Sequence, residues 1–215
     1  MGGTLIVFVG VDGTGKSSLA KAVKKKIENK NIPVKYVWMR MNYLFSRPFL
    51  LICRLTGLTK RSVINGQKIS VHEFYRFKPM AKLIQYAHFV DTFLSWIKNI
   101  YFPLYVKKQV VICDRFIHDI LVDYAIEGHE WDIFSKRIAR LFNLLVPVNV
   151  KFFLITVTKE KILNRKNDVI DLDKYFNQRY LLYDKLKQNK LLKVIDNDGS
   201  IEMSLNYIFE ELNLD

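Results

Sequence analysis

The fold is decided by one stretch of sequence, Leu5-Ile-Val-Phe-Val-Gly-Val-Asp-Gly-Thr-Gly-Lys-Ser-Ser18. Residues 5–9 are apolar and mostly β-branched, which is typical of a buried parallel strand. Residues 10–17 match the pattern G-x-x-x-x-G-K-[ST] at every fixed position. Residues 18–27 then combine good helix propensity with an apolar stripe. A strand, a glycine-rich loop and a helix in this order are the context in which the motif binds nucleotide phosphates.

This loop can bind phosphate because its backbone can come close to an anion. Glycines let the backbone curl so that its N–H groups point at phosphate oxygens, and the next helix adds its positive end. We predict that Lys16 reaches the β- and γ-phosphates and that the Ser17 hydroxyl takes one position on Mg²⁺. The predicted contacts to the ATP phosphates are Gly10, Asp12, Gly13, Thr14, Gly15, Lys16, Ser17 and Ser18. A glycine turn without a ligand would leave both Lys16 and Ser17 unexplained.

The composition suits one globular domain with a basic surface. The chain has 215 residues, of which half are apolar, and 34 Lys and Arg against 21 Asp and Glu give a net charge of +13. Such a charge favours anionic partners, including nucleotides, nucleic acid or an acidic membrane surface. A solvated lysine-rich surface explains the charge equally well.

The cysteines and the apolar runs indicate a cytoplasmic protein. Cys53 and Cys113 are the only cysteines and both have apolar neighbours, so we expect a reducing compartment without disulfides. The chain runs directly into its first strand, which leaves no room for a signal peptide. Residues 43–58 are strongly apolar but are interrupted by charges and a proline, so we expect no transmembrane helix.

Strands and helices alternate along the chain. After the first strand, further strands are expected at 33–39, 109–114, 150–157 and 192–196. Residues 43–105 are expected to be mostly helical, with a polar link at 59–68 and a helix from about 73 to 100. Later helices are expected near 116–126, 130–144, 159–165, 172–189 and 200–212. This alternation predicts an α/β fold of three layers, in which helices flank a five-stranded parallel sheet within a single domain, 1–215.

A second signal is the pair Asp114-Arg115, which follows the apolar run 109–113. Open α/β sheets bind their ligands at this carboxyl edge. A carboxylate there can hold Mg²⁺ through water or accept the proton of an attacking oxygen, and Arg115 offers a fork of donors to phosphate. A helix cap is the alternative role for such an aspartate.

Taken together, Phe8-Val-Gly-Val-Asp-Gly-Thr-Gly-Lys-Ser-Ser18 and Asp114-Arg115-Phe116 resemble the thymidylate kinase family of nucleoside monophosphate kinases. One position departs from the family pattern, since Val9 stands where an acidic residue is usual. The resemblance covers most of the chain in order. It implies a P-loop NTPase fold, a helical acceptor-side region at about 43–105 and a mobile lid at about 164–172.

The resemblance also implies an activity, the transfer of the γ-phosphate of ATP to a nucleoside monophosphate, with ATP and Mg²⁺ as cofactors. The catalytic residues it implies are Lys16, Asp114, Arg115 and Arg165, with Lys166 also in the lid. The acceptor-binding residues it implies are Asp12, Arg40, His88, Arg115 and Tyr183. The resemblance implies that Ser17 and Asp114 bind the metal ion. A helix-end role is the alternative for Arg165.

The base pocket departs from the family. The family has an aromatic residue and, four positions later, an arginine that meets thymine, whereas the candidate pairs here are Tyr86 with Val90 and His88 with Thr92. After Asp114-Arg115 the family has small and amide residues, and this chain has His118, Asp119, Ile120 and Asp123. For His118 we favour a helix-surface position over a ligand role. The acceptor is therefore dTMP or a related nucleotide, or else a nucleoside, a sugar or a lipid-linked alcohol.

A different class, a nucleotide-binding switch or nucleic-acid-stimulated ATPase, fits the sequence less well. A GTPase switch needs Asp-x-x-Gly after the third strand, where this chain has Asp114-Arg-Phe-Ile. The favoured interpretation is an ATP-dependent phosphotransferase whose partners are ATP and a small phosphate-bearing acceptor, without nucleic acid. Residues 43–58 are expected to serve as core or as a homodimer face, with an apolar acceptor wall or a membrane-surface contact as the weaker alternatives.

Overall fold

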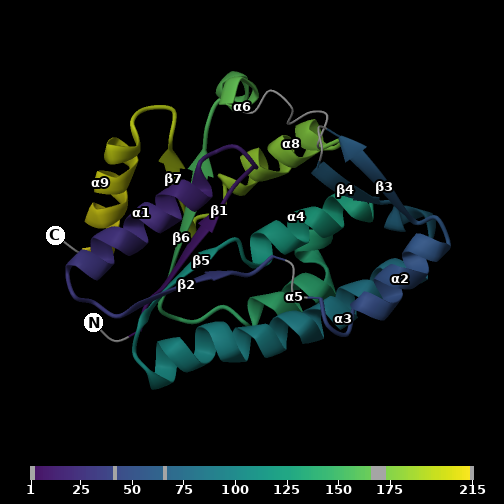
Figure 1. Cartoon of the computed structure of the whole chain (residues 1–215), viewed down its shortest axis with the longest axis horizontal. Coiled ribbons are helices and arrows are strands. Elements are labelled where there is room, and N and C mark those ends of the chain that lie inside the picture. The colour runs from purple at the N-terminus through teal and green to yellow at the C-terminus, as the bar shows by residue number, and fades with distance from the viewer. Residues whose placement is uncertain (1–2, 41–42, 65–66, 166–172, 214–215) are drawn as a thin grey trace.

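A computed structural model describes residues 3–40, 43–64, 67–165 and 173–213 (Figure 1). Its centre is a parallel sheet of five strands in the order β2-β5-β1-β6-β7. The strands are β2 (Val34–Trp38), β5 (Val110–Asp114), β1 (Leu5–Val9), β6 (Val150–Thr156) and β7 (Leu192–Asp196). The five-stranded parallel sheet expected from the sequence is thereby confirmed.

Helices cover both faces of this sheet, which makes three layers (Figure 1). Successive residues of β1 point to opposite faces, so Ile6 and Phe8 pack under α1 (Lys16–Asn29) and α9 (Ile201–Leu212). Leu5, Val7 and Val9 face the larger core on the other side. That side carries α4 (Ile117–Glu127), α5 (Arg137–Asn143) and α8 (Phe176–Leu186), with the 3₁₀ turn η3 (Ile133–Ser135) before α5. All five β1 side chains are buried because helices lie on both faces.

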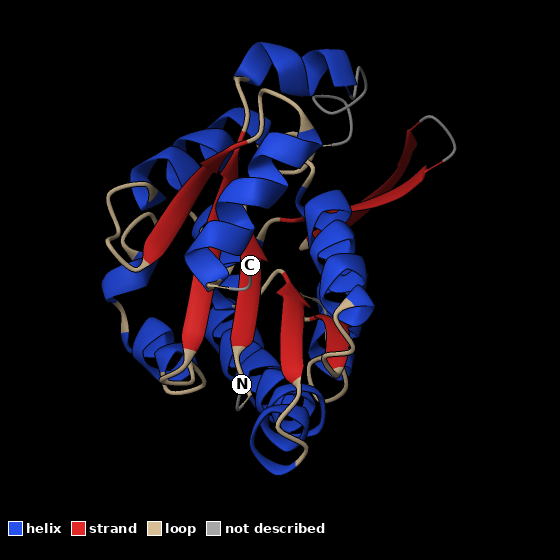
Figure 2. Cartoon of the chain, turned by 90° about the vertical axis from the view of Figure 1, so that its left-hand side faces the viewer, coloured by secondary structure: helices blue, strands red, loops and turns tan. Residues whose placement is uncertain are grey.

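The region 43–105 differs from the helical stretch that we expected. It contains α2 (Arg47–Leu55), a short turn η1 (Phe74–Arg76), α3 (Lys78–Trp96) and a π-helix η2 (Ile97–Val106). Between α2 and η1 lies an antiparallel hairpin, β3 (Thr59–Ile64) and β4 (Gln67–His72), which projects from the body of the molecule (Figure 2). The polar link predicted at 59–68 was therefore wrong. Apolar and polar residues alternate in β4, at Ile69, Ser70, Val71 and His72, but β3 shows no such alternation.

The apolar segment 43–58 is only partly core. Leu50 and Cys53 of α2 are buried against Phe74, Ala81 and Ile84 in a small separate cluster. The opposite side of the segment is exposed, at Leu44, Phe45, Leu51, Ile52 and Leu55. The expected core role therefore holds for one face of α2. The other face presents apolar surface to solvent.

Candidate functional site

The glycine-rich loop joins β1 to α1 at the carboxyl edge of the sheet. Gly10 has φ +147°, and a Cβ there would lie 2.5 Å from the carbonyl oxygen of Ile155 on β6. Gly15 has φ +88° and lies just before α1, where a Cβ would approach the Asn197 side chain at 2.6 Å. Side chains at these positions would clash and strain the backbone, which is why the loop needs glycine.

Lys16 folds back onto the loop it belongs to. Its Nζ donates to the carbonyl oxygen of Val11 at 2.8 Å and lies 3.3 Å from Asp12 Oδ1. Burial, assisted by the positive charge of Arg115, lowers the pKa of Lys16 to about 8. A buried ammonium group with a backbone carbonyl as its closest partner is well placed to exchange that carbonyl for a phosphate oxygen.

Asp12 joins three cations of the site. It pairs with Arg115 and Lys16, and its Oδ2 lies 3.5 Å from Arg40 Nη1. Burial opposes the ionisation of Asp12, but these three charges outweigh it and hold the pKa of Asp12 well below its usual value. The structure therefore brings together four residues that the sequence singled out separately.

Asp114 and Arg115 lie at the end of β5, where the sequence placed them. Asp114 is 1% exposed, and its Oδ2 accepts a hydrogen bond of 2.7 Å from the Tyr36 hydroxyl. Its Oδ1 is buried and has no hydrogen-bond partner in the described part of the chain. Arg115 has φ +67°, a left-handed conformation that is costly for a residue with a side chain and that recurs at functional sites.

These groups fit a magnesium ion that is shared with a bound nucleotide. Mg²⁺ in phosphate-transfer sites is usually held by one or two carboxylates together with substrate phosphates and water, rather than by a cage of protein ligands. The described residues contain no group of three or more His, Cys, Asp or Glu side chains that could form such a cage. The unpartnered Asp114 Oδ1 is an oxygen of the kind that Mg²⁺ prefers.

Arg40 follows β2 and is held by Asp123 of α4. Its Nε and Nη2 each donate to one Asp123 oxygen at 2.7 Å. Arg179 of α8 pairs with the same carboxylate and also donates from Nε to Asp173 at 2.8 Å. The sequence analysis missed Arg179. The sequence did contain an indication of it. Arg179 lies four residues before Tyr183, and residues four apart share one face of a helix.

Tyr183 points into the site from the same face of α8. Its hydroxyl donates to Asp119 Oδ1 at 2.6 Å, while Asp119 Oδ2 accepts from the Phe116 N–H at the start of α4. Burial raises the pKa of Asp119, although Arg115 and Lys16 act in the opposite direction. Asp119 thus links the end of β5 to α8.

Two histidines have positions that the sequence did not settle. His88 is 4% exposed, and its Nδ1 lies 2.8 Å from the Tyr124 hydroxyl. His118 was expected on a helix surface, which was wrong, since it is 8% exposed and packs edge-on against Phe152. Burial lowers the pKa of both imidazoles to about 4. Both are therefore neutral at physiological pH.

The candidate pair Tyr86 and Val90 lies on the outer face of α3. The two side chains are 45% and 43% exposed, whereas Thr92 is buried beside His88 on the inner face. Of the two candidate base-contacting pairs, only His88 with Thr92 points into the protein.

Arg165 connects to the phosphate loop through one further residue. Its Nη2 donates to the Asn197 carbonyl oxygen at 3.1 Å, and Asn197 Nδ2 donates to the Thr14 carbonyl oxygen at 2.8 Å. Asn197 was not singled out from the sequence. Lys166 and most of the lid expected at 164–172 lie outside the described residues.

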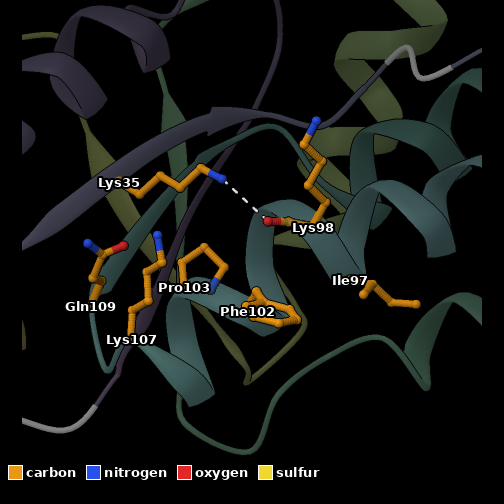
Figure 3. Close-up of a pocket in the computed structure, with 7 residues that line it drawn as sticks. All are labelled: Lys35, Ile97, Lys98, Phe102, Pro103, Lys107 and Gln109. Atoms are coloured by element: carbon orange, nitrogen blue, oxygen red, sulfur yellow. Dashed lines mark hydrogen bonds between the residues drawn. The ribbon is translucent and has the colours of Figure 1, made fainter.

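One cavity lies away from this site. It has a volume of about 500 Å³ and lies between β2 and η2. Its lining residues, drawn in Figure 3, are Lys35, Ile97, Lys98, Phe102, Pro103, Lys107 and Gln109. Gln109 precedes β5, so this space is at the opposite end of that strand from Asp114. It takes no part in the phosphate site.

Comparisons with known proteins were made for both sequence and structure. No family model matches the chain. It is 26% identical to a thymidylate kinase of Ligilactobacillus salivarius, over 99% of each chain, and 25% identical to a probable thymidylate kinase of Thermococcus kodakarensis, over 96% of this chain and 97% of the relative. These full-length relatives confirm the resemblance that the motifs indicated.

Solved structures agree at the level of the fold. The thymidylate kinase of Ehrlichia chaffeensis superimposes with a TM-score of 0.59 at 18% identity, covering all of both chains. That of Candida albicans gives 0.58 at 16% identity, covering 99% of this chain and 92% of the other. Among the described residues, no helix combines the length and the apolar character needed to cross a membrane.

Proposed function

We infer that the chain is a member of the thymidylate kinase family, and we propose that it transfers the γ-phosphate of ATP to dTMP or a closely related nucleoside monophosphate. The proposal rests mainly on the ion pairs of Asp12, which connect the predicted ATP-phosphate group to the predicted acceptor-phosphate groups. Lys16 of the phosphate loop and the acceptor-side cations Arg40 and Arg115 all lie against Asp12. A kinase needs its donor and acceptor phosphates side by side, and this cluster brings their predicted binding groups together.

ATP and Mg²⁺ are the proposed cofactors. The backbone of residues 10–15 and the Lys16 ammonium would bind the phosphates, with Ser17 and Asp114 on the metal side. The ion would supply positive charge that neutralises the charge developing on the phosphates during transfer. Asp114 suits this role because one of its buried oxygens has no partner in the described chain.

The remaining work is electrostatic and positional. Phosphoryl transfer needs little covalent help from a protein, so cations and in-line placement supply most of the rate. We propose that Lys16 leaves the Val11 carbonyl to contact the transferred group, and that Arg115 and Arg40 hold the acceptor phosphate. Arg165, which is tied to the phosphate loop through Asn197, is the proposed lid cation.

Non-nucleotide acceptors and a plain ATPase or switch are less well supported, because the full-length relatives are named thymidylate kinases. The test is Mg²⁺-dependent ATP consumption with a panel of nucleoside monophosphates that includes dTMP and dUMP. Lys16→Ala serves as the blank. We expect consumption with dTMP far above that blank. If no monophosphate supports turnover while ATP still binds, the proposal fails.

We also propose a homodimer built on the outer face of α3. That face exposes Leu83, Tyr86, Val90, Phe93 and Leu94, which are spaced so as to form one stripe. The inner face of the same helix is buried in the protein and is mostly polar, with Gln85, His88, Asp91 and Thr92 among its residues. The exposed outer stripe is therefore the more apolar face of α3, and a second copy of the chain would cover it.

A further inference from the structure

The acceptor side contains a carboxylate where the proposed function needs a free cationic clamp. Arg40 and Arg179 reach the Asp123 carboxylate from two different elements, and the exposed fractions of the three side chains are 12%, 11% and 16%. We call this pair of arginines the Arg40–Arg179 clamp. Burial opposes the ionisation of Asp123, but the two arginine charges outweigh it and hold the pKa of Asp123 well below its usual value. Asp123 is therefore an anion throughout the working pH range.

The geometry leaves little of either guanidinium free. Arg40 gives Nε and Nη2 to Asp123, and its Nη1 faces Asp12 at 3.5 Å. Arg179 gives Nη1 to Asp123 and Nε to Asp173. A carboxylate and a phosphate present the same paired oxygens to the guanidinium fork. An acceptor phosphate that uses this clamp must therefore compete with Asp123.

We propose that Asp123 sets the affinity of the acceptor side for phosphate: its carboxylate fills the Arg40–Arg179 clamp of the free enzyme, and an acceptor phosphate dianion displaces it. This inference rests on the proposed function. Two partly buried arginines need a counter-anion at all times, because an unpaired buried charge is strongly destabilising. Asp123 supplies that anion until a phosphate replaces it. An acceptor without a phosphate has nothing to offer the clamp and would leave Asp123 in place.

The test compares Asp123→Asn with the wild type, in two assays. The first is acceptor kinetics with dTMP, in which we expect KM to fall about tenfold because the competing anion is gone, a factor that corresponds to one strong charged hydrogen bond. The turnover number should change much less. Asp132→Asn removes an exposed carboxylate that pairs with Lys136 and should leave both constants unchanged. A KM for dTMP that is unchanged or higher in Asp123→Asn overturns the inference.

The second assay does not depend on catalysis. Inorganic phosphate is titrated while the melting temperature is followed, in a Lys16→Ala background so that the phosphate loop contributes little. Asp123→Asn should be stabilised at phosphate concentrations about tenfold lower than its Asp123 parent. Asp123→Glu keeps the charge and should behave like the parent.

The Asp123→Asn variant is expected to melt earlier without phosphate, because two arginines lose their partner. Added phosphate should restore the lost stability. If phosphate does not restore it, or if the variant fails to fold even with phosphate, Asp123 is purely structural and the inference is wrong. If the wild type turns over no monophosphate, the proposed function fails, and the phosphate titration still decides the role of Asp123.

Discussion

Asp12 shows how one residue connects the donor and acceptor sides. It stands within the phosphate loop, and its carboxylate contacts Lys16, Arg115 and Arg40. Its charge acts directly on the pKa of Lys16. Burial and Arg115 push the pKa of Lys16 down, while Asp12 pushes it up, and the balance leaves it at about 8.

This balance predicts a pH dependence of ATP binding. Below pH 8 the Lys16 ammonium is charged and attracts phosphate, and above pH 8 it loses its proton. The dissociation constant for ATP should therefore rise as the pH increases from 7 to 9, as measured by calorimetric titration of the free enzyme. Lys16→Arg, whose guanidinium stays charged in this range, should give a flat profile. A flat profile for the wild type would contradict this account of Lys16.

The buried histidines predict acid lability. Folded His118 has a pKa of about 4, whereas in the unfolded chain it takes up a proton near pH 6.5. The unfolded state thus binds more protons as the pH falls from 6.5 towards 4, and stability decreases. At pH 5 this histidine should cost roughly 2 kcal/mol of unfolding free energy. Denaturant unfolding at pH 7 and pH 5 measures the loss.

His118→Gln should reduce that acid-induced loss, because the new side chain does not titrate. His129→Gln is the control, since His129 is exposed. An equal acid-induced loss in the His118→Gln variant and the wild type would show that His118 is not held neutral by burial.

Among the elements, the phosphate loop depends most strictly on its residue types. In Gly10→Ala the new Cβ would meet the Ile155 carbonyl oxygen, a backbone atom that cannot turn aside. We expect weaker ATP binding, by more than about tenfold, and a loss of roughly 1–3 kcal/mol in unfolding free energy. Fluorescence titration and denaturant unfolding measure the two effects.

Gly199→Ala is the matched control. A Cβ there meets only the Met203 sulfur, at 3.5 Å, so we expect ATP affinity and stability close to those of the wild type. If Gly10→Ala bound ATP as tightly as this control, the close approach at Gly10 would not matter for the site.

The elements that the sequence predicted well are those in which local pattern and burial agree. The central strands β1 and β5 carry continuous apolar runs because both of their faces are covered. The end of the second run predicted where Asp114 and Arg115 would lie. The β3–β4 hairpin was missed because its strands are rich in Lys, Ser and other polar residues, and only β4 shows an alternation of apolar and polar residues.

The site was predicted less completely, for a physical reason. Motifs fix residues that are close in sequence, whereas the Arg40–Arg179 clamp joins α8 to the end of β2 through Asp123 on α4. Asp123 was noticed only as a departure from the family pattern. Asp123 binds both arginines only because of the way three elements pack together. That packing cannot be derived from a single sequence.

At the scale of the whole molecule, the net charge of +13 contrasts with the ion-paired site. Arg40, Arg115 and Arg179 each pair with carboxylates, so the positive charge in excess lies mainly on the surface. The three lysines around the cavity in Figure 3 are one example. The apolar outer stripe of α3 is the opposite kind of surface.

The proposed dimer makes a prediction at this scale. Leu94→Glu places a charge in the outer stripe of α3 and should shift the protein from dimer to monomer in sedimentation velocity. Leu191→Glu changes an exposed leucine elsewhere and should leave the dimer intact. A wild type that sediments as a monomer at tens of micromolar would contradict the dimer.

The central claim is phosphoryl transfer from ATP to a nucleoside monophosphate, and isotope transfer tests it most directly. The enzyme is incubated with ATP labelled at the γ-phosphate, Mg²⁺ and dTMP, and the products are separated by chromatography. We predict that the label moves to dTDP in amounts equal to the ADP formed, and that Lys16→Ala gives none. Label that appears as inorganic phosphate, or that stays in ATP, would contradict the account.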